Sequence, residues 1–441
     1  MNRNKYKYDK NSPQSILEYA LKLSGKSLSE ATQLPEGITN SRNRGDLGSL
    51  VEKYFFEHVP PNDHEPDFKE AGVELKTTGV ILKSSSYQAK ERLVLTMINY
   101  ESLVNENWEE STLKKKCQLM LILFYLYSKD VSVVDRKFVK ILLYSIPDSD
   151  ITQIKRDWEA IKQSVLDGKA HELSEGDTFY LGACRKGSGG EKESLRSQPY
   201  STEPAKSRAF SFKQSYLNKI LEGLNENKRD IGLSKTLTIA EATQLRFDPF
   251  IGKSVEEISK ELNYFKKSLT NKGFLKDISN RILSGGDEVL IELEKAGIEL
   301  KTIRLNKSGK PRESMSFPGF KYLEIINEEW EDSSFFEKIE RKFLLIIFQT
   351  DEKGSEKLLK AVYWNMPYED RLEAKRVWEE TKRRVAVDST RLPGITESKV
   401  AHVRPKARNG SDKILTPQGD MQIKKCFWLN SSYIAKVISS L

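Results

Sequence analysis

Cysteine and histidine are scarce in this sequence, which limits the chemistry that it can support. The 441 residues include three cysteines and four histidines. Three cysteines cannot form a disulfide framework, and no spacing of cysteine or histidine is typical of a zinc site. We therefore expect a protein of the reducing cytoplasm that folds without disulfides or zinc. The histidines are scattered, and none is predicted as a catalytic base: His58, His64, His171 and His402.

Long hydrophobic runs are also missing. The longest ones, at residues 119–127 and 343–348, are far too short to span a bilayer. The polar N-terminus, MNRNKYKYDKNSPQ, lacks the apolar region of a signal peptide. We therefore predict a buried strand at each run and no association with a membrane.

The composition is typical of a folded protein with a mild basic excess. Hydrophobic residues make up 38% and charged residues 31% of the chain, and the net charge is +8 with a pI of about 9.0. The excess favours an acidic polymer such as nucleic acid as a partner, although 64 acidic residues offset most of the 72 basic ones. The length predicts two or three domains.

The sequence repeats itself at about half its length. GVELKT at 72–77 matches GIELKT at 297–302, and other matches follow in the same order with an offset that falls slowly. These are GKSLSE (25–30) with GKSVEE (252–257), Trp108 with Trp330, Trp158 with Trp378, Phe210 with Phe427, and Tyr216 with Tyr433. Collinear matches indicate a duplicated domain. We predict one domain over residues 1–225 and a second over 236–441, joined by the polar linker LNENKRDIGLSK.

Each copy mixes helical and strand patterns. Apolar residues recur every three or four positions at 49–59 and 151–166, which predicts helices. Apolar alternation or continuous apolar runs at 73–82, 92–100 and 117–127 predict strands. The expected fold is α/β or α+β, with helices flanking a central mixed sheet in each copy.

The segment PDFKEAGVELK carries the candidate chemistry. Because side chains alternate along a strand, Glu74 and Lys76 lie on the same face, and the turn before them folds Asp67 back alongside. Glu52, on the helix upstream, could add a third carboxylate. Two or three carboxylates beside an ammonium are suited to hydrolysis of a phosphodiester with Mg²⁺ held by Asp67 and Glu74.

The alternative is structural, because a glutamate and a lysine two residues apart on a strand are common as a simple charge pair. The repeat favours chemistry in the first copy. The second copy keeps the pair as Glu299 and Lys301 but differs at the other positions. There, Asn280 aligns with Glu52, Glu292 with Asp67, and Glu340 with Lys116.

These residues resemble a known family. The first copy resembles the DNA mismatch repair nicking endonuclease MutH in three ordered features: GDLGSLVEKYFF, then PDFKEAGVELKT, then a lysine ahead of an apolar strand. The duplication resembles type II restriction endonucleases that have two MutH-like domains and cut at GATC. The resemblance implies a PD-(D/E)xK nuclease fold, Mg²⁺ and double-stranded DNA as substrate. It implies a catalytic core of Asp67, Glu74 and Lys76, supported by Glu52 and Lys116, and a second domain that binds DNA and regulates.

The same resemblance suggests residues that contact DNA. The family's Arg-Pro-Lys segment matches Arg404 and Lys406 in the second copy and, more loosely, Arg185 and Lys186 in the first. Arginine and lysine commonly bond guanine edges, whereas contact with phosphate or a solvated loop charge is the alternative. We expect residues 185–207, rich in Gly, Ser and Pro, to form a mobile loop.

We therefore predict a Mg²⁺-dependent type II restriction endonuclease that cuts at GATC. Because GATC is a palindrome, one active site per chain implies that two chains meet on the DNA or that one chain rebinds. Restriction implies a cognate DNA methyltransferase that acts on the same site. Two alternatives remain open. One is a nicking repair endonuclease like MutH, and the other is a DNA-binding regulator without catalysis.

Overall fold

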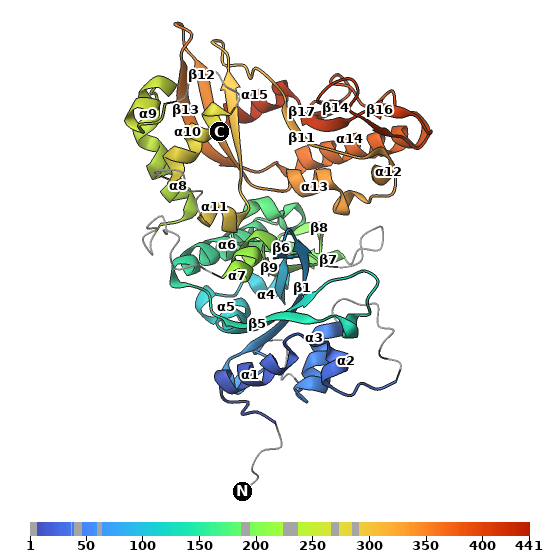
Figure 1. The fold of residues 1–441 in the computed structure, drawn as a ribbon. Coiled ribbons are helices and arrows are strands. Elements are labelled where there is room, and N and C mark those ends of the chain that lie inside the picture. The colour runs from blue at the N-terminus through green and yellow to red at the C-terminus, as the bar shows by residue number, and fades with distance from the viewer. Residues whose placement is uncertain are drawn as a thin grey trace.

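The computed structural model describes most of the chain in two similar halves. The described residues are 7–36, 38, 46–59, 64–186, 195–223, 237–265, 273–284 and 291–441. The predicted linker at 224–235 lies outside them. Figure 1 shows the first half in blue to green below and the second half in yellow to red above. Among the described residues, no helix combines the length and the apolar character of a membrane span.

The first half alternates short helices with strands. In chain order these are α1 (Pro13–Ala20), α2 (Leu28–Ala31), α3 (Asp46–Leu50), η3 (Val51–Phe55), η4 (Lys69–Ala71), β1 (Glu74–Lys83), β2 (Ser86–Ala89), β3 (Leu93–Met97), α4 (Tyr100–Leu103), α5 (Thr112–Cys117), β4 (Met120–Leu126), β5 (Phe138–Tyr144), α6 (Asp148–Leu166), β6 (Leu181–Arg185), β7 (Leu195–Gln198), β8 (Ser201–Lys206), β9 (Arg208–Phe212) and α7 (Gln214–Glu222).

The second half follows the same plan. Its elements are α8 (Ile239–Phe247), α9 (Val255–Glu261), α10 (Phe274–Ser284), α11 (Ile291–Ala296), β10 (Glu299–Leu305), β11 (Met315–Gly319), α12 (Tyr322–Ile325), α13 (Ser334–Ile339), β12 (Phe343–Thr350), β13 (Glu356–Trp364), α14 (Tyr368–Val387), β14 (Ala401–Pro405), β15 (Lys413–Leu415), β16 (Met421–Ile423), β17 (Lys425–Leu429) and α15 (Ser431–Ser440).

The sheets of the two halves have matching strand orders. In the first half a mixed sheet has the order β2-β1-β4-β5, in which β1 and β4 are parallel, and an antiparallel sheet has the order β3-β9-β6. In the second half the orders are β10-β12-β13, with β10 parallel to β12, and β11-β17-β14. The α/β prediction is confirmed. The second sheet in each half was not expected from the sequence.

The central strands are buried on both sides, as their continuous apolar sequences predict. Met120 to Tyr125 of β4 and Phe343 to Phe348 of β12 are each at most 4% exposed. Burial of β4 comes from helices on one side and the N-terminal segment on the other. One apolar cluster runs from α6 and α7 of the first half through α8, α10 and α11 into β12 and β13, so the halves share a core.

One local prediction is wrong, and another differs from the structure in its bounds. Residues 195–206, expected as part of a mobile loop, form the antiparallel pair β7 and β8, because Gln198 is buried and bonded to the backbone on both sides. The remaining part of that loop, residues 187–194, lies outside the described residues. The helix expected at 49–59 is shorter, since α3 passes into a π-helical turn at Val51 that ends at Phe55.

Candidate active site

A tight turn before β1 brings Asp67 next to Glu74. Gly72 in this turn has a φ of 66°, a left-handed conformation that glycine adopts without steric cost. The N–H of Leu75 donates to Asp67 Oδ2 at 2.7 Å, and the N–H of Asp67 donates to Glu74 Oε2 at 3.3 Å. The turn therefore holds two buried carboxylates side by side at the start of β1.

The Glu74 carboxylate is shared by two lysines. Its Oε1 lies 2.6 Å from Lys76 Nζ and 3.2 Å from Lys116 Nζ. Its side chain is only 2% exposed, so these charges are needed to offset the cost of burying the carboxylate. Alternation along β1 places Glu74 and Lys76 on one face, as the sequence indicated.

Lys116 reaches the same point through the fold. In the parallel pair β1 and β4, Glu74 is opposite Met120. The helix α5, which Ser111 caps through the N–H of Lys114, ends three residues before β4 begins. The last turn of α5 therefore lies beside the start of β1, where Lys116 is 42 residues from Glu74 in sequence.

Glu52 comes to the site on the π-helical turn η3. This turn is closed by a bond from the N–H of Phe56 to the carbonyl of Val51 at 3.0 Å. The hydroxyl of Tyr19 donates to the carbonyl of Phe55 at 3.2 Å, and that of Tyr8 donates to the carbonyl of Phe56 at 3.1 Å. π-Helical turns are rare and are frequent at functional sites.

The carboxylates repel one another. Burial, followed by the charge of Asp67, raises the pKa of Glu52 to about 7. Burial, followed by the charge of Glu74, raises the pKa of Asp67 to about 6. If all three acids ionise, two lysines do not neutralise them. A bound cation would relieve this repulsion.

The donor set fits a magnesium ion. Asp67 and Glu74 offer carboxylate oxygens, the ligands that Mg²⁺ prefers, and proteins commonly hold Mg²⁺ through one or two carboxylates together with water and a substrate phosphate. In the part of the chain that the structure describes, no group of three or more Asp, Glu, His or Cys side chains is placed to hold a metal by itself. The site therefore fits a metal completed by the substrate.

His58 also contacts the site, although the sequence analysis set it aside. Its Nε2 lies 2.5 Å from the carbonyl oxygen of Asp67, and its ring stacks on Phe68 with centroids 4.8 Å apart. The imidazole thus fixes the backbone at Asp67. His58 and Asp67 are nine positions apart in sequence, a spacing that matches no motif, so only the structure shows this contact.

Arg185, predicted to contact DNA, is paired within the protein. Its guanidinium lies 3.4 Å from Glu331 Oε1 and 4.5 Å from the ring centre of Phe336, both in the second half. Lys186 follows β6, and its N–H donates to the carbonyl of Ser207 at 2.8 Å. Arg185 therefore contributes to the contact between the halves.

Arg404 and Lys406 lie on and just after β14. The Arg404 guanidinium stacks on Trp428, 4.1 Å from the ring centre, and Lys406 Nζ donates to the carbonyl of Phe317 at 2.8 Å. Lys406 and Trp428 line a pocket with Lys276, Lys301 and Arg304 among other residues. Lys406 thus lines a hollow of the second half in which basic residues outnumber acidic ones, and Arg404 stacks on Trp428, which lines the same hollow.

Strand register refines the match between these basic pairs. The N–H of Lys406 donates to the carbonyl of Lys424, as that of Lys186 does to Ser207. In the antiparallel sheets, Arg404 is opposite Cys426 and Cys184 is opposite Ala209. Lys406 therefore corresponds to Lys186, but Arg404 corresponds to Cys184 and not to Arg185.

The second half keeps only part of the site. Glu299 Oε1 and Lys301 Nζ are 2.6 Å apart on β10, as in the first half. Asn280 lies on the regular helix α10 and Glu292 on α11. The expected match of Lys116 with Glu340 is wrong, because Ser111 and Ser333 cap equivalent helices. Counting from these caps, Lys338 corresponds to Lys116.

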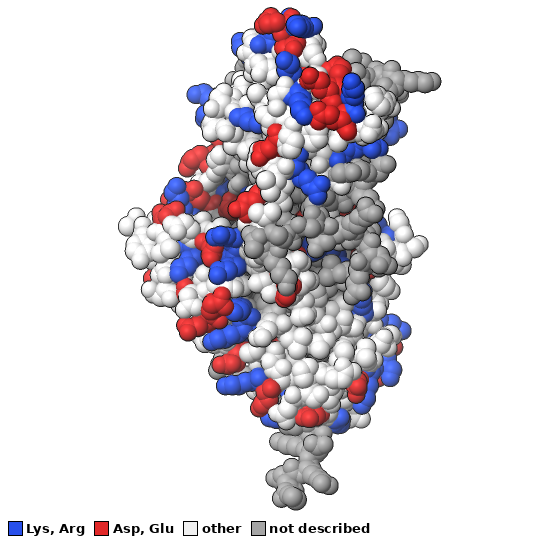
Figure 2. All heavy atoms as spheres, turned by 90° about the vertical axis from the view of Figure 1, so that its left-hand side faces the viewer, with Lys and Arg blue, Asp and Glu red and all other residues white. Residues whose placement is uncertain are grey.

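The net charge does not point to one DNA-binding face. On the face in Figure 2, Lys and Arg side chains alternate with Asp and Glu side chains over both halves. Alternating charges give a weak field at a distance. Recognition on this face would therefore depend on individual contacts more than on the overall charge of +8.

Comparison with known proteins relates both halves to nucleases. The family model of the DNA mismatch repair enzyme MutH matches residues 56–157 and 286–375. The type II restriction enzyme Sau3AI of Staphylococcus aureus is 32% identical to the chain, over 97% of the chain and 98% of Sau3AI. The chain belongs to the Sau3AI family of type II restriction enzymes. It is therefore a DNA-cleaving hydrolase that binds double-stranded DNA.

Two mismatch repair proteins show the more distant relationship. MutH of Shewanella amazonensis is 27% identical over 37% of the chain and 73% of MutH. MutH of Buchnera aphidicola is 24% identical over 36% of the chain and 73% of MutH. The predicted resemblance to MutH and to tandem restriction endonucleases is thus confirmed. The two stretches matched by the family model include Asp67, Glu74 and Lys76 in one half and Glu299 and Lys301 in the other.

Proposed function

We propose that this restriction enzyme uses Mg²⁺ to cut double-stranded DNA at GATC and that the first half carries the active site. The observation that carries the assignment is the buried Glu74 carboxylate, which lies beside Asp67 and is shared by Lys76 and Lys116. The corresponding pair in the second half, Glu299 and Lys301, is the relic of duplication.

Each residue of the site has a distinct part in this proposal. Asp67 and Glu74 would hold Mg²⁺, and Glu52 supports them from η3. When bound there, Mg²⁺ would neutralise charge on the phosphate and lower the pKa of its bound water. Lys76, on the face of β1 that Glu74 occupies, orients the attacking water, and Lys116 places a second positive charge beside the buried Glu74 carboxylate.

The second domain, residues 236–441, binds a further copy of the target and favours the cutting-competent assembly of two chains. Arg404 and Lys406 are its DNA contacts, and Lys186 is the equivalent contact of the catalytic domain, residues 1–225. Arg185 can join Lys186 only if it leaves Glu331. Two chains are needed because one active site cuts one strand of a palindrome. The host DNA is protected by a methyltransferase that modifies the same sequence.

A plasmid assay tests the function. Supercoiled, unmethylated plasmid with GATC sites is incubated with the protein and Mg²⁺, beside a plasmid whose GATC sites are removed and a reaction with chelator. The proposal requires linear fragments with ends at GATC from the first plasmid alone. Nicked circles would indicate a repair-type nicking enzyme, and binding without cleavage would indicate a regulator.

A second plasmid assay tests the role of the second domain. Plasmids with two sites are expected to be cut faster than plasmids with one, because the additional site favours the assembled state. Arg404→Ala combined with Lys406→Ala should remove the difference and leave the slow rate on one site unchanged. Equal rates of the wild-type protein on the two plasmids would contradict this role.

A further inference from the structure

The two halves contact each other through unlike faces. The first half contributes α6 and α7, and the second half contributes α8 and α11, which Figure 1 shows directly above them. A contact between unlike faces of two similar units is a head-to-tail contact. When such a contact repeats, it produces open chains of subunits, unless the rotation from one subunit to the next closes them into a ring.

Two ion pairs mark this contact. Lys295 Nζ lies 2.9 Å from both carboxylate oxygens of Asp150, and the two side chains are 7% and 3% exposed. Lys219 Nζ lies 2.6 Å from Glu294 Oε2. A buried charge is tolerated only with a partner, so Lys295 and Asp150 depend on each other.

Two further hydrogen bonds join these four helices. The N–H of Ile239, the first residue of α8, donates to Gln153 Oε1 at 3.0 Å. The hydroxyl of Ser215 donates to the carbonyl of Lys295 at 2.8 Å. The start of α8 and the end of α11 are thus fixed on α6 and α7.

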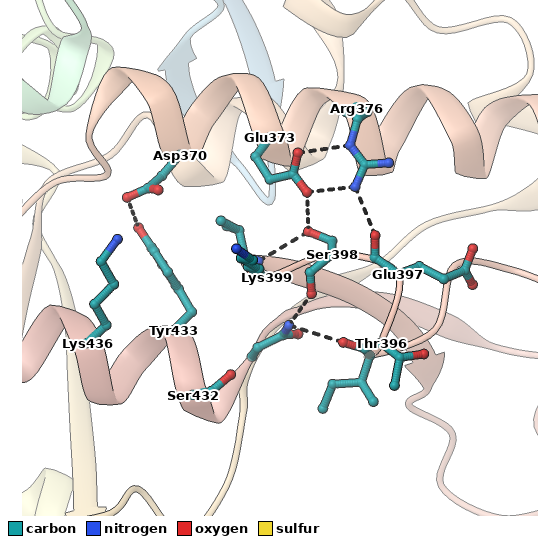
Figure 3. Close-up of a pocket in the computed structure, with 13 residues that line it drawn as sticks. Asp370, Glu373, Arg376, Thr396, Glu397, Ser398, Lys399, Ser432, Tyr433 and Lys436 are labelled. Carbon is teal, nitrogen blue, oxygen red and sulfur yellow. Dashed lines mark hydrogen bonds and ion pairs between the residues drawn. The ribbon is translucent and has the colours of Figure 1, made fainter.

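The second half has the same receiving face, and it is open. Figure 3 shows it as a pocket between α14, α15 and the chain at 395–400. Tyr433 donates to Asp370 at 2.8 Å, as Tyr216 donates to Asp150 at 2.8 Å. Aligning the two halves on these two Tyr–Asp pairs gives the equivalent positions of the other residues of the face. Glu373 corresponds to Gln153, Ser432 to Ser215, and Lys436 to Lys219.

The first half has the corresponding inserting face. The glycines Gly72 and Gly297, both with positive φ, align its turn with the end of α11. Glu70 then corresponds to Lys295, and Lys69 corresponds to Glu294. The N-caps Ser12 and Thr238 align α1 with α8, so that Pro13 corresponds to Ile239.

Three of these four contacts are lost when the faces of two copies are paired, and only the serine hydroxyl is kept, as Ser432 in place of Ser215. Glu70 would face Asp370 in place of the pair between Lys295 and Asp150. Lys69 would face Lys436 in place of the pair between Glu294 and Lys219. Pro13 has no N–H to donate, and the residue opposite it, Glu373, already accepts from Arg376 and Ser398. Like charges at an interface are a common means of excluding a wrong partner.

We infer that the contact between the two halves could also form between separate copies of this protein and link them into open head-to-tail chains. Residues on both faces prevent this: Pro13, Lys69 and Glu70 on the inserting face, and Asp370, Glu373 and Lys436 on the receiving face. The duplication created two inserting and two receiving faces. One pair is used within the chain. The remaining two faces are kept apart by charge.

Charge reversal at either end tests the inference in the absence of DNA. The first variant combines Lys69→Glu with Glu70→Lys, which gives the inserting face the charges of Glu294 and Lys295. The second combines Asp370→Lys with Lys436→Glu, which matches the receiving face to the natural Glu70 and Lys69. Sedimentation velocity over a range of protein concentrations is expected to show a concentration-dependent series of multiples of the chain mass for each variant.

The quadruple variant is the decisive control. With both ends reversed, the like charges face each other again, so its mass should return to that of the wild-type chain. Circular dichroism of all variants checks that they are folded. The inference is overturned if both two-residue variants keep the wild-type mass, if the quadruple variant associates as strongly as they do, or if the wild-type protein itself forms chains.

Discussion

The candidate active site and its counterpart in the second half share a strand but differ in what surrounds it. Glu74 and Lys76 repeat as Glu299 and Lys301 with the same distance of 2.6 Å. The Glu74 side chain is 2% exposed, whereas that of Glu299 is 32% exposed. The pair on the strand is therefore not what distinguishes the two sites.

The difference lies in the groups that reach the strand from other elements. Around Glu74 these are Asp67 from the turn, Lys116 from α5 and Glu52 from η3. A local pair of charges survives duplication easily, because it needs only two residues on one face of a strand. A catalytic site of the proposed kind needs side chains from several distant segments to meet at one point.

The largest expected effect separates Glu74 from Glu299. Glu74→Gln keeps the size of the side chain but removes the charge that holds the metal and both lysines. Cleavage of DNA should slow by on the order of 10³-fold or more, since several kcal/mol of metal-assisted stabilisation is lost. The matched Glu299→Gln should stay close to the wild-type rate. Single-turnover rates on a short GATC duplex measure both, and similar losses for the two variants would refute the assignment of one active site.

A smaller effect separates Lys116 from Lys338. Lys116→Ala removes one of the two lysines that hold the buried Glu74 carboxylate, so the carboxylate is less firmly placed for the metal. We expect a loss of roughly tenfold to a hundredfold at limiting Mg²⁺, partly recovered at high Mg²⁺. Lys338→Ala, at the equivalent position of α13, should have no effect. A loss at limiting Mg²⁺ that saturating Mg²⁺ does not reduce would contradict this role.

The smallest expected effect concerns pH and Glu52. Its pKa is raised to about 7 in the folded protein, so the folded state binds a proton that the unfolded state releases above its ordinary pKa of 4.5. Metal-free protein should therefore lose stability as the pH rises through this window. Glu52→Gln should be the more stable protein at about pH 8, by roughly 1–3 °C in melting temperature after allowance for solvent screening, with no difference near pH 5.

Mg²⁺ supplies the control for this comparison. Added at about pH 8, it should raise the melting temperature of the wild-type protein more than that of Glu52→Gln, because the metal replaces the missing positive charge. Thermal melts of both proteins with and without Mg²⁺ provide the measurement. If the two proteins respond to pH in parallel, Glu52 does not titrate in this range.

Much of the fold could be predicted because its signals are local. The continuous apolar run at 119–127 could only be a buried strand, and the structure has β4 at Met120–Leu126. The helix at 151–166 follows from apolar spacing, and α6 covers Asp148–Leu166. The hairpin β7 and β8 was missed, because its Gly, Ser and Pro content is typical of a loop and its order depends on Gln198, which bonds to the backbone of Ala170 and Glu203.

The sequence by itself determined the duplication, the α/β class and the placing of Glu74 and Lys76 on one face of a strand, since each depends on residue order or on the alternation of side chains. Only the tertiary structure decided that Lys116 shares the Glu74 carboxylate, that His58 holds the backbone of Asp67, and that Arg185 pairs with Glu331. These contacts join segments that are far apart in sequence, and no repeating pattern in the sequence indicates that they meet. They follow from the register of β1 on β4 and from the packing of one half on the other.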